Sequence, residues 1–426
     1  MRIIHTSDWH LGQNFYTKSR KNEHQAFLDW LLEQITEHQV NALIVAGDIF
    51  DTGSPPSYAR EMYNQFVVAL QKTQCALVVL GGNHDSVSVL NETKQILAYL
   101  NTHVIASSLE ENDQQVIELK GDKGDIGALL CAIPFLRPRD LVVSQSGESS
   151  TDKKVALADA IKTHYASVYN HALIKQKELQ RARSDRAIPI IATGHLTALG
   201  VKQSESVRDI YIGSLEGFAA DGFPPADYIA LGHIHRPQIV AKKEHIRYCG
   251  SPIPLSFDEL KSEKQVLLLD FEQSPSPTIT PIFVPRFQAM ATISGSLAEI
   301  ETQLNDYRLD ENSSKEAQNE HQVGDGAMWV SIEVEIDDYL SDLQQRIQLL
   351  VADLPVEVLQ LKRSQSSRRK ALTQQKNETL DELKPADVFE KRLDQEVFES
   401  DEELERKTRL QNAFLTIVSE VEESMK

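Results

Sequence analysis

Residues 42–51, ALIVAGDIFD, decide the fold that this sequence predicts. The segment starts with an apolar run that is typical of a buried strand and continues into Gly47, Asp48 and Asp51. A glycine here permits a tight turn and a close approach of the backbone to a bound ion or phosphate. Taken alone, Gly-Asp-x-x-Asp is usually a turn followed by a helix cap, because Asp serves both purposes. The other segments of the chain therefore decide how it is interpreted.

Four other segments repeat this order of an apolar run followed by polar side chains. Their polar parts are Asp8-Trp9-His10, Gly82-Asn83-His84-Asp85, Gly194-His195 and Gly232-His233-Ile234-His235. We expect the five preceding strands at residues 2–6, 42–46, 76–80, 188–193 and 228–231. In a layered α/β fold, ligands bind just beyond the carboxyl ends of strands, so five such ends can converge on one crevice.

The five segments together supply a set of oxygen and nitrogen donors without a thiolate. These candidate metal ligands are Asp8, His10, Asp48, Asn83, His195, His233 and His235. Such donors suit Mn²⁺, Fe²⁺ or Zn²⁺ with open coordination positions, and they argue against a closed structural zinc site. Each fragment alone is weak evidence, because an Asp-x-His after a strand is more often a cap and a surface histidine. Their conjunction in one order favours a metal centre.

This ordered set resembles the calcineurin-like metallophosphoesterase superfamily, whose pattern runs Asp-x-His, Gly-Asp-x-x-Asp, Gly-Asn-His-(Asp or Glu), Gly-His, Gly-His-x-His. Nearly the whole chain is also similar to a narrower group, the SbcD family of bacterial nuclease subunits, which are relatives of the Mre-type double-strand-break nucleases. The segments that carry this likeness are MRIIHTSDWHLG (1–12), VAGDIFDTGSPPS (45–57), PFLRPRD (134–140), VRDIYIG (207–213), ALGHIHR (230–236) and YCGSPIPLSF (248–257). The resemblance implies a two-sheet metallophosphoesterase sandwich flanked by helices.

The resemblance also implies a role for each candidate residue. One metal ion would be bound by Asp8, His10, Asp48 and His235, and a second by Asp48, Asn83, His195 and His233. The implied cofactor is two Mn²⁺ ions per chain, with Mg²⁺ or another divalent cation as the alternative.

Two further residues match catalytic positions of the family. His84 matches the residue that protonates the leaving oxygen or stabilises the transition-state phosphate, and a histidine titrates near working pH. Asp51 matches the carboxylate that orients this histidine in related phosphatases, although an N-cap of the following helix is an equal alternative.

The function that the resemblance implies is the Mn²⁺-dependent nuclease half of an ATP-driven complex. It would act as a 3′–5′ exonuclease on duplex ends and as an endonuclease on hairpins and single strands, in DNA repair, recombination and replication. One alternative is a stand-alone phosphatase or cyclic-nucleotide phosphodiesterase of the same superfamily. The additional residues that follow the catalytic unit argue against it. Another is a non-catalytic scaffold, but every expected ligand is present together with His84.

Three domains are expected: a nuclease domain at residues 1–285, an α+β capping domain that positions DNA at 286–364, and a linker with C-terminal helices at 365–426. The capping domain is predicted from a strand at 289–294, a helix at 297–307, a strand at 329–336, a helix at 339–352 and a strand at 356–362. A chain end of this kind more often packs on its own domain. The resemblance instead implies docking on the coiled-coil base of SbcC, an SMC-like ABC ATPase, with two copies of each subunit.

Helical spacing of apolar residues predicts helices at residues 23–38 and 58–72. A third, long surface helix is expected within residues 147–186, with Ala156, Ile161, Tyr165 and Leu173 as its apolar anchors.

Net charge is −19, from 44 basic and 63 acidic residues, which at first argues against a DNA partner. Basic residues do cluster near the motifs, although a solvated loop is the default interpretation of such clusters. A bound dication would also reverse the local field. We therefore expect a partner subunit to help hold the DNA. The clusters are Lys18, Arg20 and Lys21, and Arg137 and Arg139.

Cysteine usage and the apolar runs indicate the compartment. Cys75, Cys131 and Cys249 are widely spaced within apolar segments, so we expect buried, reduced thiols. The start of the chain lacks the character of a signal peptide, and no apolar run approaches a membrane span. A cytoplasmic location is expected, at the nucleoid when the protein is on DNA.

Overall fold

Two six-stranded sheets form the centre of the computed structural model in the part of the chain that it describes. That part is residues 1–363 without 110, 123, 143–148, 183–186, 209, 211–216, 273–274, 310–326 and 336–342, together with Lys407, Arg409, Leu410, Ala413 and Phe414. The first sheet has the order β14 (Thr278–Phe283), β13 (Gln265–Asp270), β1 (Arg2–Thr6), β4 (Ala42–Val45), β5 (Ala76–Leu80) and β6 (Thr102–Ile105). The second has the order β11 (Gln238–Val240), β12 (Lys243–Tyr248), β10 (Tyr228–Gly232), β9 (Ile190–His195), β8 (Ile126–Cys131) and β7 (Val116–Lys120).

The central strands of each sheet run parallel. In the first sheet, β1, β4, β5 and β6 are parallel, and β13 and β14 complete it antiparallel. In the second, β12, β10, β9 and β8 are parallel, with β11 and β7 antiparallel at the edges. All five predicted strands are confirmed. Their carboxyl ends therefore gather at one edge of each sheet, where the predicted ligands follow.

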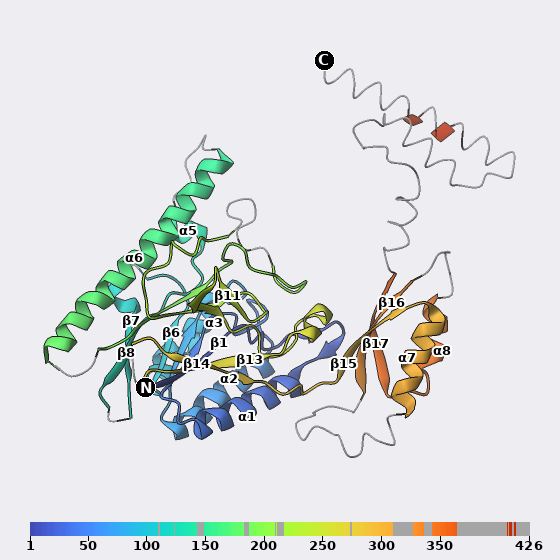
Figure 1. The fold of residues 1–426 in the computed structure, drawn as a ribbon, viewed down its shortest axis with the longest axis horizontal. Coiled ribbons are helices and arrows are strands. Elements are labelled where there is room, and N and C mark those ends of the chain that lie inside the picture. The colour runs from blue at the N-terminus through green and yellow to red at the C-terminus, as the bar shows by residue number, and fades with distance from the viewer. Residues whose placement is uncertain are drawn as a thin grey trace. The chain divides into compact units, whose positions relative to one another are not determined.

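The central strands β4, β5 and β10 are buried at every residue, which explains their uninterrupted apolar sequences. In β4, Ala42 and Ile44 pack between the two sheets, whereas Leu43 and Val45 face the helices. Helices α1 (Lys21–Glu37) and α2 (Ser57–Leu70) cover the outer face of the first sheet (Figure 1). Helix α6 (Ser150–Ala182) covers the outer face of the second. The expected two-sheet sandwich flanked by helices is thus confirmed.

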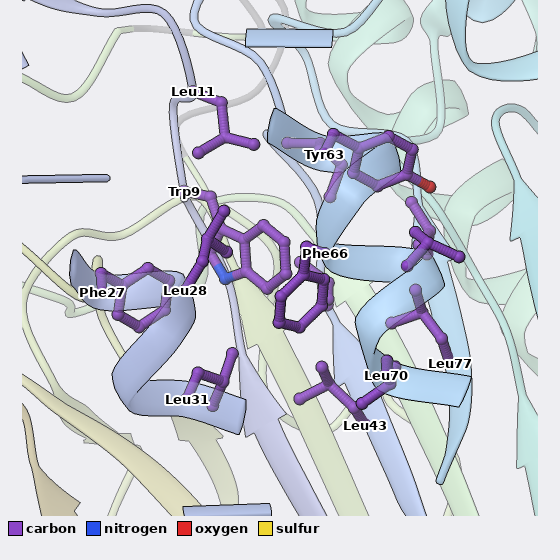
Figure 2. Close-up of a cluster of buried hydrophobic side chains, with 14 of the residues drawn as sticks. Trp9, Leu11, Phe27, Leu28, Leu31, Leu43, Tyr63, Phe66, Leu70 and Leu77 are labelled. Carbon is purple, nitrogen blue, oxygen red and sulfur yellow. The ribbon is translucent and has the colours of Figure 1, made fainter. Parts of the chain in front are cut away.

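Trp9 links this core to the predicted site, because it lies between two candidate ligands in the sequence. Its ring packs edge-on against Phe27 of α1 and Phe66 of α2, at 5.8 and 5.3 Å between centroids (Figure 2). Its indole N–H donates to Thr6 Oγ1 at 3.0 Å. A buried aromatic residue held on both sides fixes the loop that bears Asp8 and His10.

Helix α6 lies within the predicted range, but its buried face differs from the prediction. Ile161 and Tyr165 are buried as expected, whereas Ala156 and Leu173 are only half-buried. The fully buried positions recur every three or four residues, which places them on one face of the helix against the second sheet. They are Leu157, Ile161, Tyr165, Val168 and Ala172.

The predicted strand and helix order beyond residue 285 is also present. It comprises β15 (Met290–Gly295), α7 (Leu297–Leu309), β16 (Met328–Val334), α8 (Leu343–Val351) and β17 (Val356–Arg363), in a sheet of order β15-β16-β17 with β15 and β16 parallel. Phe15 stacks on Trp329 of β16, with 5.7 Å between ring centroids. Residues 1–334 and 340–362 form one compact unit, and residues 335–339 and 363–426 form another. Apart from the five described residues between 407 and 414, the predicted C-terminal helices lie outside the described residues.

Short elements complete the chain: β2 (Asn14–Phe15), β3 (Lys18–Ser19), α3 (Val87–Glu92), α4 (Lys94–Ala98), α5 (Pro138–Leu141), and the 3-10 helices η1 (Gln71–Thr73), η2 (Asn112–Gln115) and η3 (Phe257–Lys261). Among the described helices, none combines the length and apolar character that crossing a membrane requires. Cys75, Cys131 and Cys249 are free and buried, as predicted.

Candidate metal centre

The loops after β1 and β4 are held together by their backbones. Asp8 N–H donates to the carbonyl of Gly47, and His10 N–H to the carbonyl of Asp48, both at 3.0 Å. Asp8, His10 and Asp48 have φ values of 54°, 47° and 52°, in the left-handed region that costs a non-glycine residue free energy. The surrounding hydrogen bonds and the core below Trp9 hold this backbone in place.

Two glycines are required because side chains of the site approach them closely. A Cβ at Gly47, which has a φ of 94°, would lie 2.2 Å from Nδ1 of His195. A Cβ at Gly82 would lie 2.1 Å from Oδ1 of Asp48. Any side chain at either position would displace the groups that the sequence predicts as ligands.

A first group of candidate ligands consists of Asp8, His10 and His235, all buried. One donor atom of each lies within 4.8 Å of the others. The Asp8 carboxylate accepts hydrogen bonds from Ser7 Oγ at 2.5 Å and from His233 N–H at 2.9 Å. Its charge is therefore held in place by residues that directly follow two different strands, β1 and β10.

A second buried group consists of Asp48, His195 and His233, with Asn83 beside them. His195 donates from Nδ1 to the carbonyl of Ala46 at 2.9 Å, which leaves Nε2 facing the site. That nitrogen lies 2.8 Å from Asn83 Oδ1 and 3.2 Å from Asp48 Oδ2. Burial opposes a charged ring, but the Asp48 carboxylate outweighs it and raises the pKa of His195 to about 9. The environment that favours a proton here would also favour a cation.

Several donor atoms at this site fit a metal ion. Among the described buried side chains, Nε2 of His10 has no hydrogen-bond partner, and Nδ1 of His233 faces Asn83 Oδ1 at 3.1 Å. Burial and the nearby His195 hold the pKa of His233 well below its usual value, so its ring is neutral and able to coordinate. Asp48 Oδ2 lies 3.2 Å from His195 Nε2 and 3.7 Å from His10 Nε2, between the two groups. The centre is therefore built to hold divalent metal.

His84 and Asp51 lie beside these groups, but their contact differs from the one expected. His84 Nδ1 donates to the backbone carbonyl of Asp51 at 2.7 Å, whereas the Asp51 carboxylate accepts from Nδ1 of His10 at 3.1 Å. The alternative of an N-cap is wrong, because α2 begins six residues later and Pro56 precedes it. His84 is half-buried, and burial lowers its pKa.

Asp85 is a structural residue of the site to which the sequence analysis gave no role. Its carboxylate accepts from Gly82 N–H at 2.8 Å, Phe50 N–H at 3.0 Å and Ile49 N–H at 3.1 Å. These bonds tie the loop after β5 to the loop after β4. Burial and the charge of Asp48 raise the pKa of Asp85 to about 6. Its place at the end of Gly-Asn-His-Asp was the signal that could have revealed it.

Glu259 was also missed, together with Ser206 and Lys264. Glu259 is fully buried, with Oε1 at 3.5 Å from Nδ1 of His235. Burial opposes its charge, but the adjacent Lys264 ammonium holds the pKa of Glu259 well below its usual value. The available signal was weak: Glu259 follows YCGSPIPLSF by two residues.

The two basic clusters have different surroundings. Arg20 is buried and pairs with Glu23 at 2.6 Å, so it is part of the core and unavailable to a nucleic acid. Arg137 and Arg139 instead line a hollow of about 630 Å³ together with Asn83 and His84. Arg137 donates to the carbonyl of Asp85 at 3.2 Å, and its buried Nη1 has no partner within the described structure.

Comparisons with known proteins agree with this geometry. Residues 1–237 match the model of the calcineurin-like phosphoesterase family, and residues 286–397 match that of the type 5 capsule protein repressor C-terminal domain. The SbcD subunit of the SbcCD nuclease from Escherichia coli K12 is 52% identical over 416 residues, which are 98% of this chain and 97% of that protein. The SbcD subunit of Rhodobacter capsulatus is 34% identical, over 70% of this chain and 74% of that protein. The SbcD subunit of Bacillus subtilis is 28% identical, over 80% of this chain and 81% of that protein. The chain therefore belongs to the calcineurin-like phosphoesterases and, within them, to the SbcD family of nuclease subunits.

Proposed function

We propose that this chain is the nuclease subunit of an SbcCD-type complex and that it hydrolyses DNA phosphodiesters with two divalent cations, preferably Mn²⁺. The observation that carries the proposal is the convergence of oxygen and imidazole donors from five strand ends into two buried groups, with Asp48 between them. The relatives named as subunits of the SbcCD nuclease support DNA as the substrate. Histidine donors favour Mn²⁺ over Mg²⁺.

Each ion position would be held by four of the predicted ligands. Asp8, His10 and His235 would hold one ion and Asn83, His195 and His233 the other, with Asp48 shared. The chemistry that two bound cations would supply at this site is activation of a water and stabilisation of charge on the phosphate during an in-line displacement. The Asp51 carboxylate would orient His10 through Nδ1, as the carbonyl of Ala46 orients His195.

His84 would act without binding metal. Because its Nδ1 donates to the Asp51 carbonyl, the proton it can give to the leaving oxygen is the one on Nε2. Burial lowers the pKa of His84 and thus favours release of that proton, while an anionic phosphodiester nearby favours its uptake. Arg137 and Arg139 line the same hollow as His84 and would contact the DNA backbone.

The domains would divide the work as the sequence predicts, into a nuclease domain at 1–285, a capping domain at 286–364 and an SbcC-binding region at 365–426. The cap touches the catalytic part through Lys18 and Glu357 at 2.5 Å and through Lys362 and Glu205 at 3.3 Å. The charge of −19 limits long-range attraction of DNA, so the SbcC subunit would supply much of the binding.

A cleavage assay tests the function, the metal and the partner together. With Mn²⁺, SbcC and ATP, we expect 3′–5′ degradation of blunt duplex DNA and cutting of hairpins and single strands. We expect lower rates with Mg²⁺ and without the partner. Hydrolysis of a small phosphodiester, with hairpin DNA left intact in every condition, would instead favour a stand-alone phosphodiesterase.

Removal of residues 378–426 tests the partner region. The shortened chain retains every predicted ligand, so it should still bind Mn²⁺ and cleave single strands, but it should no longer copurify with SbcC. Affinity purification of tagged SbcC, with Mn²⁺ binding to each chain measured in parallel, gives both readouts. Copurification at the level of the full chain would contradict the assignment of this region.

A further inference from the structure

His235 is contacted on two sides by one buried ion pair, Glu259 and Lys264. Glu259 reaches its ring through Ser206, and Lys264 binds its backbone carbonyl. Its Nδ1 lies 2.6 Å from the hydroxyl of Ser206, and that hydroxyl contacts Glu259 Oε1. Its carbonyl accepts from the Lys264 ammonium at 3.0 Å. Glu259 and Lys264 pair with each other at 2.6 Å. Three side chains outside the predicted ligand set thus converge on one ligand.

The surroundings of Glu259 fix it as an ionised acceptor. Its Oε2 accepts from Lys264 and from the N–H of Leu255 at 3.0 Å, and its Oε1 accepts from Ser204 Oγ at 2.7 Å. A carboxylate without a proton can only accept hydrogen bonds. Lys264 is itself buried, so the pair is shielded from solvent. Burying two charges has a desolvation cost that can exceed what their pairing returns, so stability alone does not account for this pair.

The hydrogen bonds determine which nitrogen of His235 carries the proton. Ser206 has a single hydroxyl proton, and Glu259 can only accept, so Ser206 donates to Glu259. The hydroxyl oxygen must then accept from Nδ1 of His235. In the neutral imidazole, a proton on Nδ1 leaves Nε2 free, and an unprotonated imidazole nitrogen is the form that coordinates a metal.

We propose that Ser206 and Glu259 are positioning residues that fix His235 in the tautomer with a free Nε2, and so set the affinity of one ion position only. That position is the one shared with Asp8 and His10. The proposal rests on the proposed function in taking these three side chains as ligands. The other position has a separate orienting contact, because His195 donates to the backbone carbonyl of Ala46.

The test is a titration of the full chain with Mn²⁺. Binding is measured by calorimetry and by the electron paramagnetic resonance signal of free Mn²⁺. Loss of a residue that orients a metal ligand typically weakens binding about 10- to 100-fold. We expect this loss at one of the two positions in Ser206→Ala and in Glu259→Gln, with the other position unchanged. Ser206→Thr keeps the hydroxyl and should restore wild-type affinity.

Glu205→Gln is the matched control. It makes the same acid-to-amide change in the residue next to Ser206, but its carboxylate pairs with Lys362, so both affinities should stay at the wild-type value. Thermal unfolding of each variant, with a chelator present to remove metal, shows whether the variant is folded. If Glu259→Gln does not fold, the smaller substitution Ser206→Ala still tests the proposal. Unchanged binding in Ser206→Ala, equal weakening at both positions, or failure of Ser206→Thr to restore affinity would overturn the proposal.

These outcomes are separate from those of the nuclease assay. A wild-type chain that binds two Mn²⁺ ions and cleaves no DNA would refute the proposed function, and the affinity difference between the variants would still test the role of Ser206 and Glu259. Wild-type affinities in the variants, beside normal DNA cleavage, would refute the positioning role alone.

Discussion

Replacement of Asp48 by asparagine is expected to abolish DNA cleavage, with a fall in rate of more than about a thousandfold. Its carboxylate is buried and lies between His10 and His195, so among the described donors it is the one placed to serve both ion positions. An amide keeps the volume but removes the charge that offsets two dications. A thousandfold fall corresponds to about 4 kcal/mol of lost transition-state stabilisation, which is within what bound metal supplies.

The measurement for Asp48→Asn is the cleavage rate on hairpin DNA together with Mn²⁺ titration. Both ion positions should weaken, in contrast to the single position affected by Ser206→Ala. Asp270→Asn is the control, because Asp270 pairs with Arg2 at the other end of β1. If Asp48→Asn binds two ions with wild-type affinity, the bridging role is refuted.

The fold was predictable because central strands such as β4, β5 and β10 are buried on both faces and so have uninterrupted apolar sequences. Residues 42–46 and 76–80 could be assigned to strands of a layered α/β fold on this basis, and the polar residues that follow them mark the carboxyl edge. Strand order and the pairing of Leu11 with Phe50 were not visible, because they depend on contacts between segments far apart in the chain.

The contacts of the site were less predictable than its ligands. A motif shows which residue types follow a strand, but not whether a backbone carbonyl or a carboxylate will orient His84. The structure places the carbonyl of Asp51 there. Glu259 lies 53 residues from Ser206, which it contacts, and no local pattern connects them. From the sequence, Arg20 was assigned to a basic surface cluster. The structure shows that it is buried and paired with Glu23, and this burial could not be read from the sequence.

Replacement of His84 by glutamine is expected to abolish cleavage while leaving Mn²⁺ and DNA binding largely intact. Loss of a positioned acid costs a factor of about 10² to 10⁴ in rate. His84 groups with His10 and Asp51 and lies outside the two groups that Asp48 joins. Its backbone N–H, which donates to Asp48 Oδ1 at 2.9 Å, is kept in the variant. A glutamine amide can also replace Nδ1 as donor to the Asp51 carbonyl, so the loop should keep its conformation.

The decisive comparison for His84→Gln is between single-turnover cleavage and Mn²⁺ affinity in the same preparation. His103→Gln, at an exposed position of β6, makes the same substitution away from the site and should cleave at the wild-type rate. If His84→Gln cleaved as fast as the wild type, His84 would have no part in proton transfer. If it instead lost Mn²⁺ as Asp48→Asn does, His84 would be needed to build the metal centre. Normal binding with slow cleavage is the pattern that only a proton donor or a phosphate-stabilising group produces, because glutamine offers hydrogen bonds but no transferable proton at neutral pH.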